Sequence, residues 1–191
     1  MRYFTSDLHV GDSLVARWRG FPDVASHDEM VLGRLRETLG ADDELWILGD
    51  VARANVACVR RVREAVPCER VHVVLGNHDE RPKFQTVGGF VQVEHYDEVG
   101  KVAREGYKFC MSHYPMLDWN RKHNGAYMLH GHIHSLPLTP HAVPASADEG
   151  GLGIRGYNEA MREGGIRRYD VGVDANGYAP VSAEAILSYF A

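Results

Sequence analysis

Short apolar runs recur along the chain, and each one ends in a cluster of polar residues. Such runs, rich in β-branched and aromatic residues and bounded by Gly, Asp or Asn, are typical of strands covered on both faces of a sheet. The pattern predicts five strands, at Arg2–Thr5, Glu44–Leu48, Val71–Leu75, Tyr107–Met111 and Ala126–Leu129.

Two segments between these strands repeat apolar residues at helical spacing. The first helix is expected to begin at Ser26, because Ser26-His27-Asp28-Glu29 has the form of a capping box, and to end near Gly40. The second is expected to begin after a cap on Asn55 and to stop before Pro67. Strands that alternate with helices in this way predict an α/β fold.

The last third of the chain has a less regular pattern. Three prolines and six glycines lie within Ser135–Gly165, which predicts a long loop with at most one short helix, near Tyr157–Arg162. Asn176-Gly177 lies between two apolar runs and predicts a hairpin turn. A final helix is expected at Ser182–Tyr189. Because the sequence has no repeat and no evident linker, one domain is expected over residues 1–191.

Composition narrows the range of functions. Hydrophobic residues make up 45% of the chain and charged residues 25%, as in ordinary globular proteins. Lys and Arg total 21 against 26 Asp and Glu, and the resulting net charge of −5 does not favour nucleic-acid binding through overall charge. No apolar run approaches the roughly 20 residues of a membrane helix, so no membrane partner is expected.

Cysteine usage and the first residues bear on the cellular compartment. Cys58, Cys68 and Cys110 are odd in number and lack C-x-x-C spacing, which excludes a disulfide framework and a zinc ribbon. The N-terminal residues turn polar too early for a secretory signal. A reducing, cytoplasmic location is therefore expected.

The polar cluster after each predicted strand contains side chains that bind metal ions. In open α/β sheets, ligands bind beyond the carboxyl ends of the strands, so we expect the five clusters to converge on one site. The clusters are Asp7-Leu8-His9, Gly49-Asp50, Gly76-Asn77-His78-Asp79, Ser112-His113-Tyr114-Pro115 and His130-Gly131-His132-Ile133-His134.

The types of side chain in these clusters indicate the kind of ion. Imidazole, carboxylate and amide groups without a thiolate suit divalent ions of the first transition row. Strand-like alternation over His132-Ile133-His134 would direct both imidazoles to one side, where each could reach a different ion. The candidate ligands are too many for one tetrahedral ion and fit two ions that share a bridging carboxylate; they are Asp7, His9, Asp50, Asn77, His113, His132 and His134.

Taken singly, most of these motifs have ordinary explanations. Asp-x-His and Gly-Asp are common in caps and turns, and Ser112-His113 fits a core histidine with satisfied hydrogen bonds. The longer motifs are more specific: with this composition, His-Gly-His-x-His is expected by chance roughly 0.004 times and Gly-Asn-His-Asp roughly 0.002 times. Because both occur after predicted strands, a metal site is the better explanation.

Together, the motifs resemble those of the calcineurin-like metallophosphoesterase superfamily. All five motifs of that family occur in order, as Asp7-x-His9, Gly49-Asp50, Gly76-Asn77-His78-Asp79, His113 and Gly131-His132-x-His134. The start of the chain is similar to small bacterial and phage members without a cap domain. The resemblance implies a sandwich of two β-sheets flanked by helices. It also implies a phosphoesterase with two divalent ions, for which Mn²⁺ is expected and Fe, Zn²⁺ and Ni²⁺ are alternatives.

Position by position, the resemblance implies a role for each residue. One ion would be held by Asp7, His9, Asp50 and His134. The second would be held by Asp50, Asn77, His113 and His132, so that Asp50 bridges the two. His78 matches the catalytic histidine of the family, and Asp79 matches the acidic residue that orients it.

Two further residues are candidates for substrate binding. Arg53 stands where the family usually has a second Asp, in Gly-Asp-x-x-Asp, and its guanidinium suits bidentate binding of phosphate. A solvated arginine at a helix start is the alternative for Arg53. His130 is a candidate on the substrate side of the site, with a structural role as the alternative. The Ser135–Gly165 loop follows His134 directly, and it either narrows the cleft or simply carries the chain onward.

These expectations combine into one reaction. A hydroxide between the two ions would attack phosphorus in line, while His78 protonates the leaving oxygen and Asp79 fixes the ring of His78. The expected substrates are small phosphomonoesters or phosphodiesters, including cyclic nucleotides.

Two alternative functions are weighed against this one. A nuclease or RNA-end phosphatase ranks lower because the sequence has no evident basic stripe. A metal-binding scaffold without catalysis would be indicated by a missing His78 or a missing ligand, and every one of these positions is filled. The oligomeric state is left open.

Overall fold

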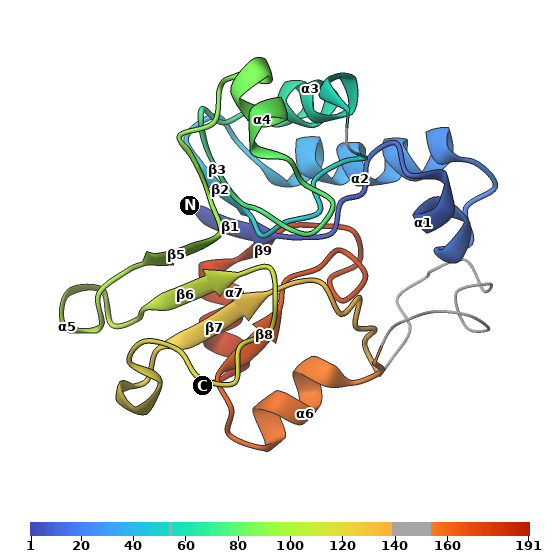
Figure 1. The fold of residues 1–191 in the computed structure, drawn as a ribbon. Helices are drawn as coiled ribbons and strands as arrows, with labels where there is room; N and C mark the ends of the chain where they lie inside the picture. The colour runs from blue at the N-terminus through green and yellow to red at the C-terminus, as the bar shows by residue number, and fades with distance from the viewer. Residues whose placement is uncertain (54, 139–153) are drawn as a thin grey trace.

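The computed structural model describes residues 1–53, 55–138 and 154–191, and its two β-sheets lie face to face with helices on the outside (Figure 1). The first sheet has the order β4-β3-β2-β1-β9, formed by β1 (Arg2–Thr5), β2 (Glu44–Ile47), β3 (Arg70–Val74), β4 (Gln92–Glu94) and β9 (Val181–Ser182). The second has the order β5-β6-β7-β8, formed by β5 (Tyr96–Val99), β6 (Phe109–Ser112), β7 (Tyr127–His130) and β8 (Arg168–Asp170). Both sheets are mixed, because β9 and β5 run antiparallel to their neighbours and the other pairs are parallel. The predicted α/β fold of two sheets flanked by helices is confirmed.

Two apolar clusters hold these layers together. One lies between the sheets, where Phe4 and Trp46 of the first sheet join Phe109 and Leu129 of the second. The other lies between the first sheet and helices α2 (Val24–Thr38), α3 (Val56–Ala65) and α4 (Arg81–Val87), which cover its outer face (Figure 1). Because apolar burial is the main driving force of folding, these two cores fix the strand ends relative to one another.

The remaining helices lie at the sheet edges and in the connections. α1 (Ser13–Trp18) follows β1, α5 (Val102–Glu105) connects β5 to β6, and a short 3-10 helix (Lys122–Asn124) precedes β7. α6 (Tyr157–Glu163) lies beside β8, and α7 (Ala183–Tyr189) packs on β1 and β9. Among the described residues, no helix is both long and apolar enough to cross a bilayer.

Most of the predicted elements are present. The five predicted strands occur within two residues of their expected ends, as β1, β2, β3, β6 and β7. The second predicted helix is α3, and its cap Asn55 accepts a hydrogen bond from the backbone N–H of Cys58 at 2.8 Å. The short helix and the final helix are α6 and α7. Residues 139–153, the middle part of the predicted loop within Ser135–Gly165, lie outside the described residues.

The start of the first predicted helix needs correction. α2 begins at Val24, and its cap is Asp23, whose carboxylate accepts from the backbone N–H of Ser26 at 2.7 Å. Ser26 therefore lies inside the first turn. An Asp satisfies the free N–H groups of a helix start as well as a Ser does, so the earlier acceptor sets the boundary.

The predicted hairpin around Asn176-Gly177 is wrong. β8 pairs with β7 in the second sheet and β9 pairs with β1 in the first, so this segment crosses from one sheet to the other. The Asn176 side chain donates to the carbonyls of Asp170 and Gly172, and the Val173 N–H donates to the carbonyl of Ser6. These bonds hold the segment against the end of β1 and take the place of a hairpin ladder.

Candidate metal centre

The polar residues that follow β2, β3 and β6 meet at the carboxyl ends of those strands. Oδ2 of Asp50 lies 3.5 Å from Nε2 of His9 and 3.5 Å from Nε2 of His113. Oδ1 of Asn77 lies 3.0 Å from the same Nε2 of His113. Asp50 is therefore the point at which ligands from three strand ends and from the end of β1 come together.

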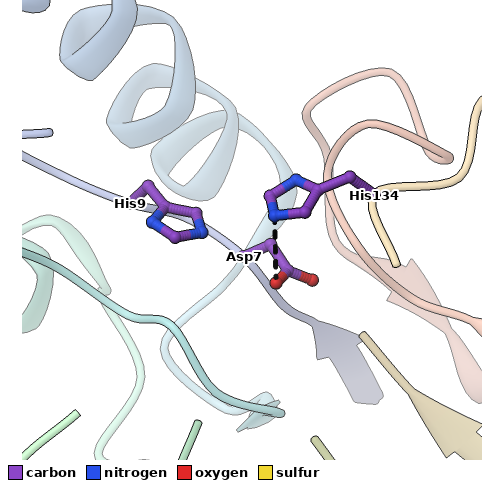
Figure 2. A group of neighbouring side chains, drawn as sticks. All are labelled: Asp7, His9 and His134. Atoms are coloured by element: carbon purple, nitrogen blue, oxygen red, sulfur yellow. Dashed lines mark ion pairs between the residues drawn. The ribbon is translucent and has the colours of Figure 1, made fainter. Parts of the chain in front are cut away.

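The residues that follow β1 and β7 complete the site. Nε2 of His134 lies 3.8 Å from Oδ1 of Asp7, and the rings of His9 and His134 are stacked with their centroids 5.2 Å apart (Figure 2). Both carboxylate oxygens of Asp7 accept from the backbone N–H of His132, at 3.2 and 3.0 Å. Because the ring of His132 lies 5.0 Å from that of His113, all seven candidate ligands gather in one place.

Two groups of these side chains could hold an ion by geometry. The ligand atoms of Asp7, His9 and His134 lie within 4.8 Å of one another, and so do those of Asp7, Asp50 and His113. The first group agrees with the set expected for one ion. The second brings Asp7 close to ligands expected for the other ion. Two buried carboxylates, Asp7 and Asp50, thus form the middle of the site.

The backbone directs these side chains in a way that the sequence did not indicate. Seven described residues other than glycine have positive φ, and five of them are candidate ligands: Asp7 (58°), His9 (51°), Asp50 (51°), His132 (73°) and His134 (46°). The predicted strand-like alternation of His132 and His134 is therefore wrong, because both project from left-handed turns. Left-handed backbone costs roughly 1–2 kcal/mol per residue, and such strain is typical of functional sites.

Hydrogen bonding determines which nitrogen of His113 faces the site. Nδ1 lies 2.9 Å from the carbonyl of Leu48, and because a carbonyl only accepts, Nδ1 carries the proton. Nε2 is left facing Asp50, which is the arrangement of a metal-binding imidazole. Burial lowers the pKa of His113, but Asp50 and Asp7 outweigh burial and raise it to about 9. A cation at Nε2 is therefore strongly favoured.

Nε2 of His9 is buried and has no hydrogen-bond partner among the described residues. Burial and the charge of Arg19 hold the pKa of His9 well below its usual value, so the ring is neutral and Nε2 or Nδ1 keeps a lone pair. An unpartnered buried nitrogen is costly. Nitrogen and oxygen ligands about 2.1 Å from one ion lie roughly 3.0–3.5 Å apart, which agrees with the 3.5 Å between His9 and Asp50. These residues fit a divalent ion.

The two central carboxylates have pKa values shifted in opposite directions. Burial raises the pKa of Asp7 to about 6, because the nearby imidazoles offset it only in part. Burial acts in the same direction on Asp50, but His113 and the backbone N–H of His78 outweigh it and hold the pKa of Asp50 far below the usual value. Asp50 is thus ionised at neutral pH and carries negative charge into the middle of the site.

Two residues to which the sequence analysis assigned no role, Arg19 and Asp174, hold His134 in place. Nδ1 of His134 donates to Oδ2 of Asp174 at 2.8 Å, and Arg19 donates to both oxygens of Asp174, at 2.8 and 2.6 Å. Burial raises the pKa of Asp174, but Arg19 and His134 outweigh it and hold that pKa far below the usual value. The apolar run at 171–173 before Asp174 repeats the pattern of the other clusters and could have identified it. No local pattern marks Arg19.

His78 and Asp79 occupy different environments. The side chain of His78 is 53% exposed, and its Nε2 lies 4.0 Å from Oδ2 of Asp50. Asp79 accepts hydrogen bonds from the backbone N–H groups of Asp50 (2.7 Å), Val51 (3.1 Å) and Gly76 (2.9 Å), and burial raises its pKa to about 6. These bonds tie the loops after β2 and β3 together. The expected contact of Asp79 with the His78 ring is not among its hydrogen bonds in the described structure.

The two candidate substrate residues also differ. Arg53 has an exposed side chain, and its backbone N–H donates to the carbonyl of Val10 at 2.8 Å. The binding of a substrate phosphate by its guanidinium stays a prediction. His130 is fully buried: Nδ1 donates to the carbonyl of Gly131 at 2.9 Å, and Nε2 accepts from the hydroxyl of Tyr157 at 3.0 Å. Both ring nitrogens therefore make hydrogen bonds inside the protein. His130 has the structural role given as the alternative and does not face the substrate side of the site.

Comparison with protein families adds an independent observation. The family model for the calcineurin-like phosphoesterase superfamily domain matches residues 3–154. The chain belongs to the calcineurin-like phosphoesterase superfamily. The matched range contains all seven candidate ligands of the chain, as well as His78 and Asp79. Membership of this superfamily supports metal-dependent phosphoesterase chemistry in general terms.

Two relatives of the chain come from mycobacterial phages, and a solved structure with a similar fold comes from Aquifex aeolicus. The chain is 27% identical to the Gene 66 protein of Mycobacterium phage L5 and 29% identical to that of Mycobacterium phage D29. Each match spans 161 residues and covers 70% of this chain, with 77% and 78% of the phage proteins covered. A crystal structure of a protein of unknown function, AQ665 from Aquifex aeolicus, matches over 98% of both chains with a TM-score of 0.67 and 23% identity. That similarity shows a shared fold.

Proposed function

We propose that the protein is a binuclear metal-dependent phosphoesterase that hydrolyses small phosphomonoesters or phosphodiesters, cyclic nucleotides included. The observation that carries the proposal is the position of Asp50, whose Oδ2 lies 3.5 Å from Nε2 of both His9 and His113. A carboxylate oxygen between two imidazoles from different strand ends suits a bridge between two cations. Two bound cations also explain why a net charge of −5 does not oppose an anionic substrate, because the ions add +4 locally.

The proposed ligands divide into two sets around Asp50. One ion is held by Asp7, His9, Asp50 and His134, and the other by Asp50, Asn77, His113 and His132. Mn²⁺ is the proposed ion, with Fe, Zn²⁺ and Ni²⁺ as alternatives that the same nitrogen and oxygen ligands accept. When bound, such a pair activates a water molecule as nucleophile and withdraws charge from the phosphoryl oxygens.

His78 is proposed as the acid that protonates the leaving oxygen. Its backbone N–H donates to Oδ1 of Asp50 at 2.9 Å, while its side chain is 53% exposed and free to contact a substrate at the mouth of the site. This combination keeps the ring beside the ligands without making it one of them. Asp79 acts indirectly, because its bonds to the loops after β2 and β3 fix the position from which His78 projects.

The accessibility of the site supports a broad range of phosphate esters. Asn77, His78 and His132 are exposed, and Tyr114 is 47% exposed with its ring 4.7 Å from that of His132. A terminal or bridging phosphate can therefore approach from solvent on this side. The three cysteines are free thiols, which supports a reducing, cytoplasmic location as part of the proposal.

The deciding experiment measures metal content and turnover on the same samples. Metal-free protein is titrated with Mn²⁺, Ni²⁺, Zn²⁺ and Mg²⁺, and each form is assayed with nitrophenyl phosphate, bis-nitrophenyl phosphate and 2′,3′- and 3′,5′-cyclic nucleotides. Two ions per chain and turnover of a small ester are expected. Two bound ions without any turnover would favour the inactive scaffold, and faster cleavage of RNA or RNA ends than of small esters would favour the nuclease or RNA-end phosphatase.

A further inference from the structure

A buried chain of hydrogen bonds leads away from the candidate ligands toward α1 and α2. It begins at His134, whose Nδ1 donates to Oδ2 of Asp174 at 2.8 Å. Arg19 approaches Asp174 from the other side, with Nε 2.8 Å from Oδ1 and Nη2 2.6 Å from Oδ2. Arg19 is 4% exposed and Asp174 is 8% exposed. The pair is a bidentate ion pair inside the protein.

The same guanidinium also contacts the other end of the site. Nη2 of Arg19 donates to the backbone carbonyl of Asp7 at 2.7 Å. Asp7 has a left-handed backbone with φ 58°, which a non-glycine residue adopts only when its surroundings hold it there. Arg19 therefore connects the imidazole of His134, through Asp174, to the strained backbone that directs the Asp7 carboxylate.

Nη1, the third guanidinium nitrogen of Arg19, also has a hydrogen-bond partner. Nη1 lies 2.8 Å from Nε2 of His27, which must accept because a guanidinium only donates. Nδ1 of His27 then donates to Oδ1 of Asp28 at 3.1 Å, and Oδ2 of Asp28 accepts from Arg61 at 2.6 Å. Arg61 is 46% exposed in its side chain, so the chain of bonds ends at the surface. In each hydrogen bond of this chain, the donor and the acceptor are therefore identified.

A buried ion pair of this kind is a poor device for stability alone. Removing two charges from water costs several kcal/mol per ion, and apolar residues of similar volume often stabilise a fold as well or better. The pair instead controls the orientation of the His134 ring. The Asp174 carboxylate keeps the proton of His134 on Nδ1, so that Nε2 presents its lone pair toward Asp7. His113 obtains the same orientation from a backbone carbonyl, so it does not depend on this pair.

We propose that Arg19 and Asp174 are positioning residues for one ion of the centre, the ion bound by Asp7, His9 and His134. The proposal rests on the proposed function only in requiring that divalent ions bind at this site. The pair fixes the tautomer and orientation of His134 and the backbone of Asp7. The second ion, bound by Asp50, Asn77, His113 and His132, should be affected less, because in the described structure Arg19 and Asp174 make their hydrogen bonds to Asp7, Leu8, His27 and His134 and to each other.

The test compares three variants by calorimetric titration of metal-free protein with Mn²⁺. Asp174→Asn keeps the shape of the side chain but removes its charge, and Arg19→Lys keeps the charge but lacks the planar fork that reaches both Asp174 and Asp7. Arg61→Ala is the matched control, since it removes a guanidinium from the outer end of the same chain of bonds. Residues that support metal ligands typically contribute about 10–100-fold to affinity. We expect a loss of that size for one of two ions in the first two variants, and wild-type binding in the control.

Thermal unfolding of the metal-free variants separates positioning from simple support of the fold. Arg19→Lys is included because it is the variant expected to fold if Asp174→Asn does not. Wild-type affinity for both ions in a folded variant would overturn the proposal, and so would an equal loss at both ions. Wild-type protein that binds two ions without hydrolysing any ester would contradict the proposed function and leave this inference in place. Wild-type protein that binds no ion would overturn both.

Discussion

Nε2 of His9 lies 3.5 Å from Oδ2 of Asp50, a distance that suits two ligands of one ion better than a hydrogen bond. The nitrogen is buried and has no hydrogen-bond partner in the described part of the chain, and the carboxylate is ionised. Folding has thus placed a buried imidazole nitrogen without a hydrogen-bond partner beside a negative charge. This is a favourable arrangement only when a cation lies between them.

Asp50→Asn should be the most damaging substitution of a single ligand. It removes a negative charge that two cations share while keeping the size of the side chain, so both ions should bind more weakly. The loss should exceed the roughly 10–100-fold that residues supporting a ligand contribute. Metal content after dialysis and calorimetric titration measure it. Asp118→Asn, on an exposed carboxylate, is the control and should bind as wild type. Native metal content and activity in the Asp50 variant would falsify the bridging role.

His78→Ala should keep both ions and lose turnover. The side chain of His78 is exposed and lies beside the ligands, so its removal deletes an acid without deleting a metal contact. General acid catalysis typically contributes about 10²–10⁴-fold, and the loss should be larger for a poor leaving group than for nitrophenolate. Steady-state kcat on an alkyl and a nitrophenyl ester, normalised to bound metal, tests this. Loss of metal with full turnover per remaining ion would show that the role is wrong.

Gly131→Ala should disturb the site through packing. A Cβ at position 131 would collide with Oγ of Ser6 and Oδ2 of Asp7, both of which lie in the buried interior. Overpacking of this kind typically costs about 1–3 kcal/mol of unfolding free energy. Asp7 would be displaced as well, so metal affinity should fall with it.

Gly33→Ala is the matched control for that change. Gly33 lies within α2 (24–38), and the nearest atom to an added Cβ is 3.9 Å away. Alanine in a helix interior is favoured over glycine by about 1 kcal/mol, so this variant should be slightly more stable than wild type and bind metal normally. Urea unfolding and metal titration of both variants give the comparison. Equal stability of the two would contradict the packing argument at Gly131.

The strands and the gathering of the candidate ligands could be predicted because both depend on local pattern. Each buried strand is a short apolar run, and each ligand cluster stands directly after one. Parallel pairing brings Asp7 and Asp50 together at one edge of the first sheet, and packing of the two sheets brings His113 to them. β4 and β5 were not predicted, because they are short and only partly buried and carry no apolar run. The left-handed turns at the candidate ligands were also not predicted, since Asp and His adopt positive φ more often than most residues but still do so at only a minority of positions.

Arg19 and Asp174 show the limit of local reasoning most clearly. The two residues are 155 positions apart in sequence, and although the apolar run before Asp174 resembles those of the ligand clusters, no local pattern marks Arg19 as its partner. Both residues are buried because the segment before β9 crosses to the end of β1. The predicted hairpin at Asn176 is incompatible with this crossing. One wrong turn assignment therefore concealed the residues that hold the candidate ligand His134 in place.

Away from the metal centre, Glu44 lies in a partly buried polar cluster at the start of β2. One carboxylate oxygen accepts from Nε2 of His72 at 3.0 Å and the other from Nε of Arg2 at 2.9 Å, and the His72 ring is stacked on Trp46 with centroids 3.9 Å apart. The hydrogen bond from His72 and the charge of Arg2 outweigh burial and lower the pKa of Glu44 from 4.5 to about 2. Because the folded state binds this proton more weakly than the unfolded state, the resulting stability is present above the unfolded pKa.

Glu44→Gln should therefore have an effect that depends on pH in a defined direction. At pH 7 the variant should lose about 1.5–3 kcal/mol of unfolding free energy, the range for hydrogen bonds to a charged group. The difference from wild type should shrink as pH falls from about 5 toward about 3, where the unfolded chain takes up the proton first. Urea unfolding of metal-free protein across this range measures it, with Glu37→Gln as control, since that carboxylate is 69% exposed beside Arg34. Exposed pairs contribute about 0–1 kcal/mol, so the control should differ little from wild type at any pH. A Glu44→Gln difference that stays constant from neutral to acidic pH would contradict the lowered pKa and leave the cluster as a packing contact.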